Sequence, residues 1–301
     1  MKIGLFELDE PLPALNSPHL ITILHPWVDA GSVGTLTLDL LEKHLHATSI
    51  GRLTKPGHFF DLTRYRPTIN YRGDERVYTV PTTTLSHAAS PTGGPDLLFL
   101  RLLEPHHEAE EYIDNLIEVI KQLKITRVCR ISSMWDAVPH TRPLPVNRTL
   151  RIPGSPPALP PSGRRYEGPT SIMNVFYERT EQAGAEQLSV MVRLPYYAQL
   201  EEDYAGTSRA LEVLSEYYAF PTSLVSQARL RRQRRDLDSE IGNKPGMESL
   251  IRQLETEYDN QQHEQPQQQG HPEQTPAGGP ETELSPEVEK FLRELGEQFG
   301  R

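Results

Sequence analysis

The chain has 301 residues, of which 41 are acidic and 31 basic, so its formal net charge is -10. This balance argues against a general nucleic-acid binder, whose affinity depends on cationic contacts with phosphates. The single cysteine, Cys129, cannot form an internal disulfide, and no apolar run approaches the roughly 18 residues of a membrane helix. Acidic residues also stand near the N-terminus, where a signal peptide needs an apolar core. We therefore expect a cytoplasmic protein without nucleic-acid or membrane partners.

Segments that favour strands and segments that favour helices alternate over the first two thirds of the chain. The expected strands are apolar runs rich in β-branched residues, at 19–25, 48–53, 96–105, 125–133 and 187–194. The expected helices carry apolar residues at helical spacing, at 32–45, 110–124 and about 170–183. This alternation predicts the α/β fold class, with a largely parallel sheet and helices on both faces.

Two stretches interrupt the alternation. Residues 58–93 are irregular, with one expected strand at 76–80 that ends at Pro81. Residues 139–169 contain nine prolines and predict a long ordered loop around one short strand at 149–152.

The last third of the chain no longer alternates between strand and helix patterns. Helical patterns at 207–218, 223–241 and 247–258 predict a helical cap packed on the sheet domain. Residues 260–285 are rich in glutamine and proline and almost lack large apolar residues, so they predict a disordered linker. Beyond it, a helix start signal at Ser285 precedes one apolar stripe, made of Val288, Phe291, Leu292, Leu295 and Phe299.

These boundaries divide the chain into four expected parts. They are an α/β core at 1–200, a helical cap at 201–259, a disordered linker at 260–285 and a tethered amphipathic helix at 286–301. A helix of about 13 residues is marginal alone in water, so the last part needs a surface to dock on. We interpret its apolar stripe as a partner-binding face.

The expected strand ends suggest where a ligand would bind. In a doubly wound sheet, ligands bind beyond the carboxyl ends of the strands, and parallel strands bring those ends to one edge. The candidate crevice residues are Asp29, Ser32, Glu104, His106, Ser132, His140, Arg142 and Tyr196. The alternative is that these residues cap strands and line a protein interface.

The loop Gly31-Ser32-Val33-Gly34 joins the first strong strand to a helix, where α/β proteins often hold a phosphate. A Walker-type loop needs a lysine after its last glycine, but Gly34 is followed by Thr35. The dinucleotide fingerprint needs three glycines, and only a G-x-x-G pair is present. The loop therefore predicts close packing of the helix on the strand, with Ser32 near the N-cap.

Other candidate chemistries are weaker. His106 and His107 beside Glu104 lack a second pair of ligand residues at suitable spacing, so we predict no metal and no cofactor. The serines lack the G-x-S-x-G elbow of serine hydrolases. Five arginines at 229–240 predict a solvated helix face, with pairs to acids four residues on.

Several short motifs in order resemble the proteasome assembly chaperone 2 family, in its prokaryotic branch, over about residues 18–259. They are LITILHPWVDAGSVGTL, DLLFLRLLEPHHEAEEY, VPHTRPLPV, YEGPTSIMNVFYERTEQAG and LPYYAQLEEDYAGTSRALEVL, of which 139–143 and 166–169 are the most specific. The resemblance implies a three-layer α/β/α sandwich, similar to the phosphorylase/hydrolase-like fold, with appended C-terminal helices. It also implies a non-catalytic chaperone that binds proteasome subunits and forms homo-oligomers, a trimer among them.

Three departures from the family pattern matter. The chain ends Phe299-Gly300-Arg301, whereas family tails that engage the proteasome carry a penultimate tyrosine. Pro195-Tyr196-Tyr197 replaces the Pro-His-Tyr that members often show near the last strand, which weakens any His-dependent chemistry there. The ATP-grasp label sometimes given to prokaryotic members implies metal-binding carboxylates and lysine-bearing nucleotide strands, and neither pattern is found.

Two functions follow as hypotheses. The first is a non-catalytic scaffold that binds a protein partner or its own subunits. The alternative is an enzyme or small-ligand binder of nucleoside or carboxylate chemistry that uses the crevice at the strand ends. No side-chain pattern is specific enough to favour catalysis, so the scaffold is the leading hypothesis.

Overall fold

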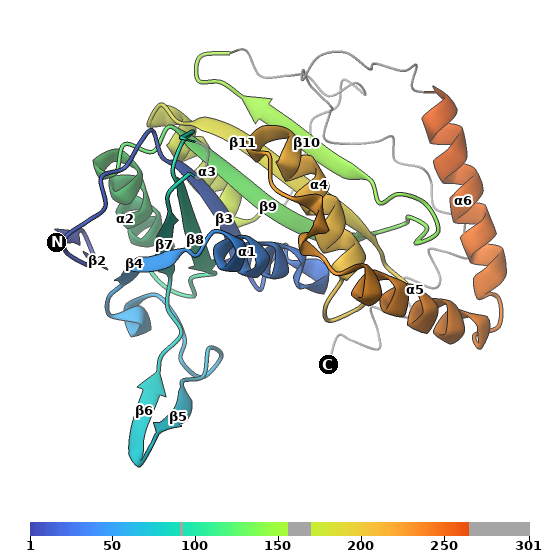
Figure 1. Cartoon of the computed structure of the whole chain (residues 1–301), viewed down its shortest axis with the longest axis horizontal. Coiled ribbons are helices and arrows are strands. Elements are labelled where there is room, and N and C mark those ends of the chain that lie inside the picture. Colours follow the sequence, from blue (N-terminus) through green and yellow to red (C-terminus); the bar gives the residue numbers. More distant parts are fainter. Residues whose placement is uncertain (91–92, 156–169, 265–301) are drawn as a thin grey trace.

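The computed structural model describes residues 1–90, 93–155 and 170–264 of the chain (Figure 1). Most of the predicted linker at 260–285 and all of the predicted helix at 286–301 lie outside the described residues. The apolar stripe of that helix therefore stays a prediction.

The centre of the molecule is a sheet with strand order β1-β2-β4-β7-β8-β3-β9-β11-β10. In chain order its strands are β1 (Lys2–Ile3), β2 (Phe6–Leu8), β3 (His19–His25), β4 (Thr48–Leu53), β7 (Thr84–Ala88), β8 (Leu97–Leu103), β9 (Arg127–Asp136), β10 (Val146–Arg151) and β11 (Glu186–Pro195). The neighbours β8, β3, β9 and β11 are parallel. The other neighbouring pairs among these strands are antiparallel.

The expectation of a largely parallel sheet is thus right for the centre and wrong for the flanks. The five strands expected from apolar runs all point the same way, because β4 is antiparallel to β7 and β7 is antiparallel to β8. The antiparallel members β2, β7 and β10 are short or polar strands. Because these strands have weak apolar patterns, the sequence did not indicate that the flanks of the sheet are antiparallel.

In the described part of the chain, helices cover both faces of the sheet (Figure 1). Helices α1 (Val33–His44) and α4 (Tyr204–Tyr218) share one core, and α2 (Ala109–Gln122) and α3 (Ile172–Gln182) share another. Strand β3 shows the division directly, since Leu20 and Leu24 belong to the α2 and α3 core while Ile21 and Ile23 belong to the other. This arrangement confirms the three-layer α/β/α sandwich.

Helix α2 shows why the helical patterns were readable. Ile113, Leu116, Ile117 and Ile120 recur at helical spacing and are all buried. Burying one such side chain stabilises the fold by roughly 1.5–3 kcal/mol, so this face fixes the helix on the sheet.

The N-terminal ends of α1 and α4 approach each other closely. A Cβ atom on Gly206 would lie 2.7 Å from Cγ2 of Val33 in α1 and 2.7 Å from Cδ2 of Leu194 in β11. A Cβ atom on Gly34 would lie 2.8 Å from Cγ2 of Ile23 in β3. Glycine is therefore needed at both helix starts for the helices to reach the sheet.

The buried side chain of Asp203 links this contact to the appended helices. The backbone N–H of Asp203 donates to the carbonyl oxygen of Gly31 at 2.8 Å. Its Oδ1 accepts a hydrogen bond from the backbone N–H of Gly206 at 2.8 Å and caps α4. The same oxygen accepts from Nε2 of Gln233 at 2.9 Å, on α5 (Gln227–Gly242).

Helices α5 and α6 (Met247–Glu264) form the appended part, at the end of the molecule away from the N-terminus (Figure 1). Leu237 and Ile241 of α5 and Ile251 of α6 make a small core of their own against Tyr197. The predicted pairs on α5 are confirmed, since Arg232 and Arg234 reach the aspartates four residues on at 3.5 and 2.9 Å. Helix α6 ends six residues later than its sequence pattern indicates.

A two-stranded hairpin, β5 (Thr68–Arg72) and β6 (Glu75–Thr79), projects from the body beside the sheet (Figure 1). The sequence prediction placed only one strand near β6 and missed β5. Almost every residue of the hairpin is exposed, and the alternation of Ile69 and Tyr71 with polar residues is too short to stand out in the sequence. Short 3-10 turns at Ala30–Ser32, Pro56–His58 and Thr222–Leu224 complete the described elements.

Replacing Gly206 by alanine tests the close approach of α1 and α4. We expect Gly206→Ala to lower the free energy of unfolding by about 1–3 kcal/mol, because the new methyl group overlaps Val33 and Leu194. Urea unfolding of the full chain measures the change. Gly242→Ala near the end of α5 is the matched control, since a Cβ there meets nothing within 4 Å. Equal stability of the two variants would contradict the packing argument.

The half-buried His19 predicts a loss of stability in mild acid. Burial, helped by the charge of Arg127, lowers the pKa of His19 from 6.5 to about 4. The unfolded chain therefore takes up a proton near pH 6.5 that the folded chain refuses, so stability is full above pH 6.5 and falls as the pH drops toward 4. In His19→Phe this fall should shrink in unfolding curves recorded between pH 7 and 4.5. His44→Gln, on an exposed histidine of α1, should keep it.

Candidate functional site

The topological basis of the predicted crevice is present. Strands β3, β8, β9 and β11 are parallel, so the segments after His25, Leu103, Asp136 and Pro195 leave the same edge of the sheet. The candidate residues nevertheless divide along this edge into three groups with different neighbours.

The first group lies in the loop between β3 and α1. Oδ1 of Asp29 accepts a hydrogen bond from the backbone N–H of Gly34 at 2.6 Å, and Oδ2 accepts from Oγ1 of Thr35 at 2.6 Å. Ser32 holds the N-cap position of α1, but its side chain makes no capping bond. The side chain of Asp29 supplies the cap that we expected from Ser32.

This cap answers the question of a phosphate site at the glycine loop. The N-terminus of α1 is the place where an anion would bind, and the Asp29 carboxylate already takes its backbone donors. A phosphate there would meet a buried negative charge. Gly31 has a φ of 58° and Gly34 touches β3, so the glycines serve the turn and the close packing.

A cavity of about 780 Å³ lies beside this loop, between the ends of β3 and β9 and the start of α3. Its walls are mostly apolar and include Trp27, Met134, Trp135, Met173 and Met191. Ser132 and Ser133 also line it, but the hydroxyl group of Ser133 donates to the carbonyl oxygen of Ala30 at 2.7 Å. Trp27 is 55% exposed and Met134 42% exposed at this cavity.

The second group, Glu104 and His106, holds a surface segment to the end of β8. Nδ1 of His106 accepts from the backbone N–H of Asp61 at 3.2 Å, and the backbone N–H of His106 donates to the carbonyl oxygen of Phe59 at 2.8 Å. The hydroxyl group of Tyr65 donates to the carbonyl oxygen of Glu104 at 3.2 Å. Burial raises the pKa of the Glu104 carboxyl, and nearby His106 partly opposes this shift.

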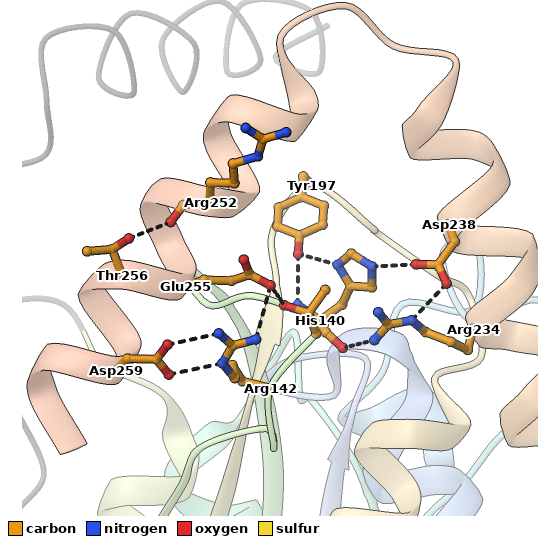
Figure 2. Close-up of polar contacts among 10 residues, drawn as sticks. His140, Arg142, Tyr197, Arg234, Asp238, Arg252, Glu255, Thr256 and Asp259 are labelled. Atoms are coloured by element: carbon orange, nitrogen blue, oxygen red, sulfur yellow. Dashed lines mark hydrogen bonds and ion pairs between the residues drawn. The ribbon is translucent and has the colours of Figure 1, made fainter. Parts of the chain in front are cut away.

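The third group, around His140, lies where α5 and α6 meet the sheet domain (Figure 2). The imidazole of His140 is 7% exposed and bridges the hydroxyl oxygen of Tyr197, 2.6 Å from Nδ1, and Oδ1 of Asp238, 3.0 Å from Nε2. The Tyr197 oxygen also accepts the backbone N–H of His140 at 2.8 Å. A neutral imidazole with its proton on Nε2 satisfies all of these contacts.

Burial keeps His140 neutral. It lowers the pKa of His140, the nearby Arg234 guanidinium adds to this, and the hydrogen bond to Asp238 partly opposes the shift. Burial also raises the pKa of Tyr197 to about 12, so the hydroxyl group stays protonated. Nη1 of Arg234 donates to the carbonyl oxygen of His140 at 2.7 Å and ties α5 to the same loop.

Arg142 holds α6 in the same way (Figure 2). Its Nε and Nη2 donate to the two carboxylate oxygens of Asp259 at 2.9 and 2.8 Å, a bidentate pair. Its Nη1 donates to Oε1 of Glu255 at 3.1 Å, which also accepts the hydroxyl group of Thr141. These three hydrogen bonds of the guanidinium all go to two acidic residues of α6.

Tyr196, the last candidate, is buried beside this group, and burial raises its pKa. A second cavity, of about 480 Å³, lies between the loop that carries His140 and helices α4 and α5. The partners of His140 and Arg142 include Tyr197, Asp238, Glu255 and Asp259, which the sequence prediction missed. Two features of the sequence could have indicated these partners. Tyr197 directly follows the candidate Tyr196 at the strand end, and the two α6 acids are four residues apart, which places them on one helix face.

The side chains of these three groups mainly hold loops and helices in place. The contacts of His140 run to a tyrosine and a carboxylate, and the Arg142 guanidinium pairs with carboxylates. Among residues 1–90, 93–155 and 170–264, no group of three or more His, Cys, Asp or Glu side chains could hold a metal ion. No helix in this part is long and apolar enough to cross a bilayer.

Arg142→Lys tests the attachment of α6. Lysine keeps the charge but cannot form the bidentate pair with Asp259, so we expect backbone amides of α6 to exchange hydrogen about tenfold faster, with global stability nearly unchanged. Hydrogen-exchange mass spectrometry of the full chain measures this. Arg252→Lys, in an exposed pair with Glu248, should leave the exchange of α6 unchanged. Equal exchange in both variants would show that Arg142 does not hold the helix.

Comparisons with known proteins agree with this architecture. The model of the PAC2 family matches residues 23–242, whereas no curated protein matches the chain. A Mycobacterium tuberculosis protein of unknown function is 22% identical, with 88% of this chain and 92% of that chain covered and a TM-score of 0.71. A Corynebacterium glutamicum protein of unknown function is 17% identical, with 86% and 99% covered and a TM-score of 0.72.

A Mycobacterium tuberculosis proteasome-assembly chaperone homologue is 22% identical, with 77% of this chain and 99% of that chain covered and a TM-score of 0.65. At these identities the solved structures show the shared fold. The family model covers more than two thirds of the chain, and it confirms the resemblance drawn from the motifs. The chain belongs to the PAC2 family.

Proposed function

We propose that this protein is a non-catalytic, cytoplasmic scaffold that binds other proteins, beginning with further copies of itself. Family membership supports this function, since one structural relative is described as a proteasome-assembly chaperone homologue. The observation that carries the proposal is the exposed aromatic face of the β5–β6 hairpin.

The register of the hairpin gathers apolar side chains on one face. Ile69 lies opposite Tyr78, and Tyr71 lies opposite Arg76, so these four side chains point to the same side. Ile69, Tyr71 and Tyr78 are 52%, 65% and 59% exposed. The guanidinium of Arg76 lies 6.0 Å from the centroid of the Tyr71 ring and donates to the hydroxyl oxygen of Tyr78 at 3.4 Å.

This face has the chemistry of a protein interface. Tyrosine and arginine are enriched at protein interfaces. An isolated two-stranded ribbon is only marginally stable in water. A ribbon that leaves two tyrosines and an isoleucine in solvent gains stability when another surface covers them.

The charge around the hairpin is compatible with a copy of the same chain as this surface. The hairpin itself is neutral, since Arg72 and Arg76 balance Asp74 and Glu75, and Arg64 and Arg66 precede it. These two preceding arginines are electrostatically complementary to a second copy, whose net charge is -10. Proteasome subunits are the second class of partner that we propose, on the strength of the family and of the described relative.

In the described part of the chain, the arrangement of the ionisable side chains does not favour the alternative of an enzyme or small-ligand binder. The ionisable side chains nearest the strand ends make the contacts that hold loops and helices, as His106, His140 and Arg142 do. A nucleoside or carboxylate that raised the melting temperature at millimolar concentration would count for the alternative.

Ile69→Ser with Tyr78→Ser in the full chain tests the hairpin as an interface. These changes remove the centre of the apolar face, so we expect the native oligomer to dissociate, with its apparent dissociation constant raised at least tenfold. Light scattering after size-exclusion chromatography measures the mass across a range of concentrations. Binding to purified proteasome α subunits, measured with the same proteins, tests the second partner class.

Asn70→Ser is the matched control. Asn70 lies on the opposite face of the same strand, so this variant should keep the mass of the wild type. A wild-type protein that is monomeric at every concentration, or an oligomer that the double variant leaves intact, would refute the hairpin interface.

A further inference from the structure

The cavity between the ends of β3 and β9 and the start of α3 has no role in the contacts described so far. It measures about 780 Å³ and is lined by two tryptophans and three methionines, together with Arg130 and smaller residues, some of them polar. Trp27 and Met134 are largely exposed at its opening, and Val175 on the neighbouring helix α3 is 42% exposed. In the described part of the chain, this apolar surface faces solvent.

The chain itself contains a segment that fits this surface. It continues for 37 residues beyond α6, and residues 286–299 predict a helix with five apolar residues on one face. Such a short helix gains stability only by covering its apolar face. The cavity offers an apolar surface that is concave, whereas the exposed face of the β5–β6 hairpin is a flat ribbon.

We propose that residues 286–299 bind, as a helix, in the Trp27–Met134 cavity of their own chain. Phe291 and Leu295 at the centre of the stripe would insert between the tryptophan and methionine side chains. The inference goes beyond the proposed scaffold function and does not depend on the hairpin.

The length of the intervening chain permits this contact. The 21 residues 265–285 would span a root-mean-square distance of about 25 Å as a flexible linker, and roughly 70 Å when fully extended. A domain of this size has a radius of gyration of about 18 Å, so a linker of this length can extend over much of the domain surface. Tethering raises the effective concentration of the helix to the millimolar range, which is enough for a weak site to be occupied.

The lining of the cavity suits an amphipathic helix better than a polar ligand. Methionine side chains are flexible and adapt to the shape of an inserted group, and tryptophan offers a large rigid surface. The volume admits a few large side chains and not a whole helix, so the helix would lie across the opening. The polar groups near the cavity bind to the protein itself, as the Arg130 guanidinium does with Oδ1 of Asn174 at 2.6 Å.

The two tryptophans make the test direct. Trp27 and Trp135 are the only tryptophans of the chain, and both line the cavity. Acrylamide quenching of tryptophan fluorescence in the full chain therefore reports whether the cavity is covered. We expect weak quenching in the wild type and a quenching constant raised at least twofold in Phe291→Ala with Leu295→Ala.

Matched variants separate this binding from general effects. Glu294→Ala with Glu297→Ala changes the polar face of the predicted helix and should quench like the wild type. Met134→Glu places a charge at the exposed rim of the cavity and should raise quenching as much as the Phe291 and Leu295 changes do. The three changes together should add nothing to either set alone, since each removes the same contact.

Three results would overturn the proposal. One is quenching that is the same in all variants. Another is full additivity between Met134→Glu and the helix changes, which would place the helix elsewhere. The third is a shielding of the tryptophans that is lost on dilution, which would mean that the helix binds a second copy. The hairpin variants Ile69→Ser and Tyr78→Ser should not change the quenching. The quenching test can therefore be interpreted even if the hairpin proves not to be an interface.

Discussion

The close contact between the starts of α1 and α4 is the constraint on which the rest of the structure depends. Gly34 and Gly206 let both helices touch the sheet, and Asp203 bonds at once to the loop before α1, to α4 and to α5. The same contact fixes the loop after β3, because Asp29 caps α1 from there. This single packing arrangement therefore fixes one wall of the Trp27–Met134 cavity and the place where the appended helices attach to the sheet domain.

Much of the fold could be predicted from the sequence because its central strands are buried on both faces. Such strands are apolar throughout, as in Leu97–Leu103, and their alternation with amphipathic helices indicates parallel order. The strands that were missed, β1, β2, β5 and β7, lack this signal. They are short, or exposed on both sides, and tertiary pairing decides their conformation more than local pattern does.

The sequence predicted the edge of the sheet where polar side chains gather, but not what they touch. The carboxylates that pair with His140 and Arg142 belong to Asp238 and Asp259, about 100 residues further along the chain. Nothing local in a sequence specifies such pairs. The N-cap shows the same limit at short range: Ser32 has the right residue type and position, yet the backbone turn brings Asp29 to the helix end instead.

The way in which α6 is attached has a consequence for the direction of the helix. The helix has 18 residues and is about 27 Å long, and it is held chiefly by Arg142 and a small apolar core. The Arg142 pairs lie at Glu255 and Asp259, whereas the apolar contact of the helix through Ile251 lies nearer its start. Loss of the Arg142 contact would therefore free the part of α6 beyond Ile251 first, so this one side chain fixes the direction in which the helix runs along the sheet domain.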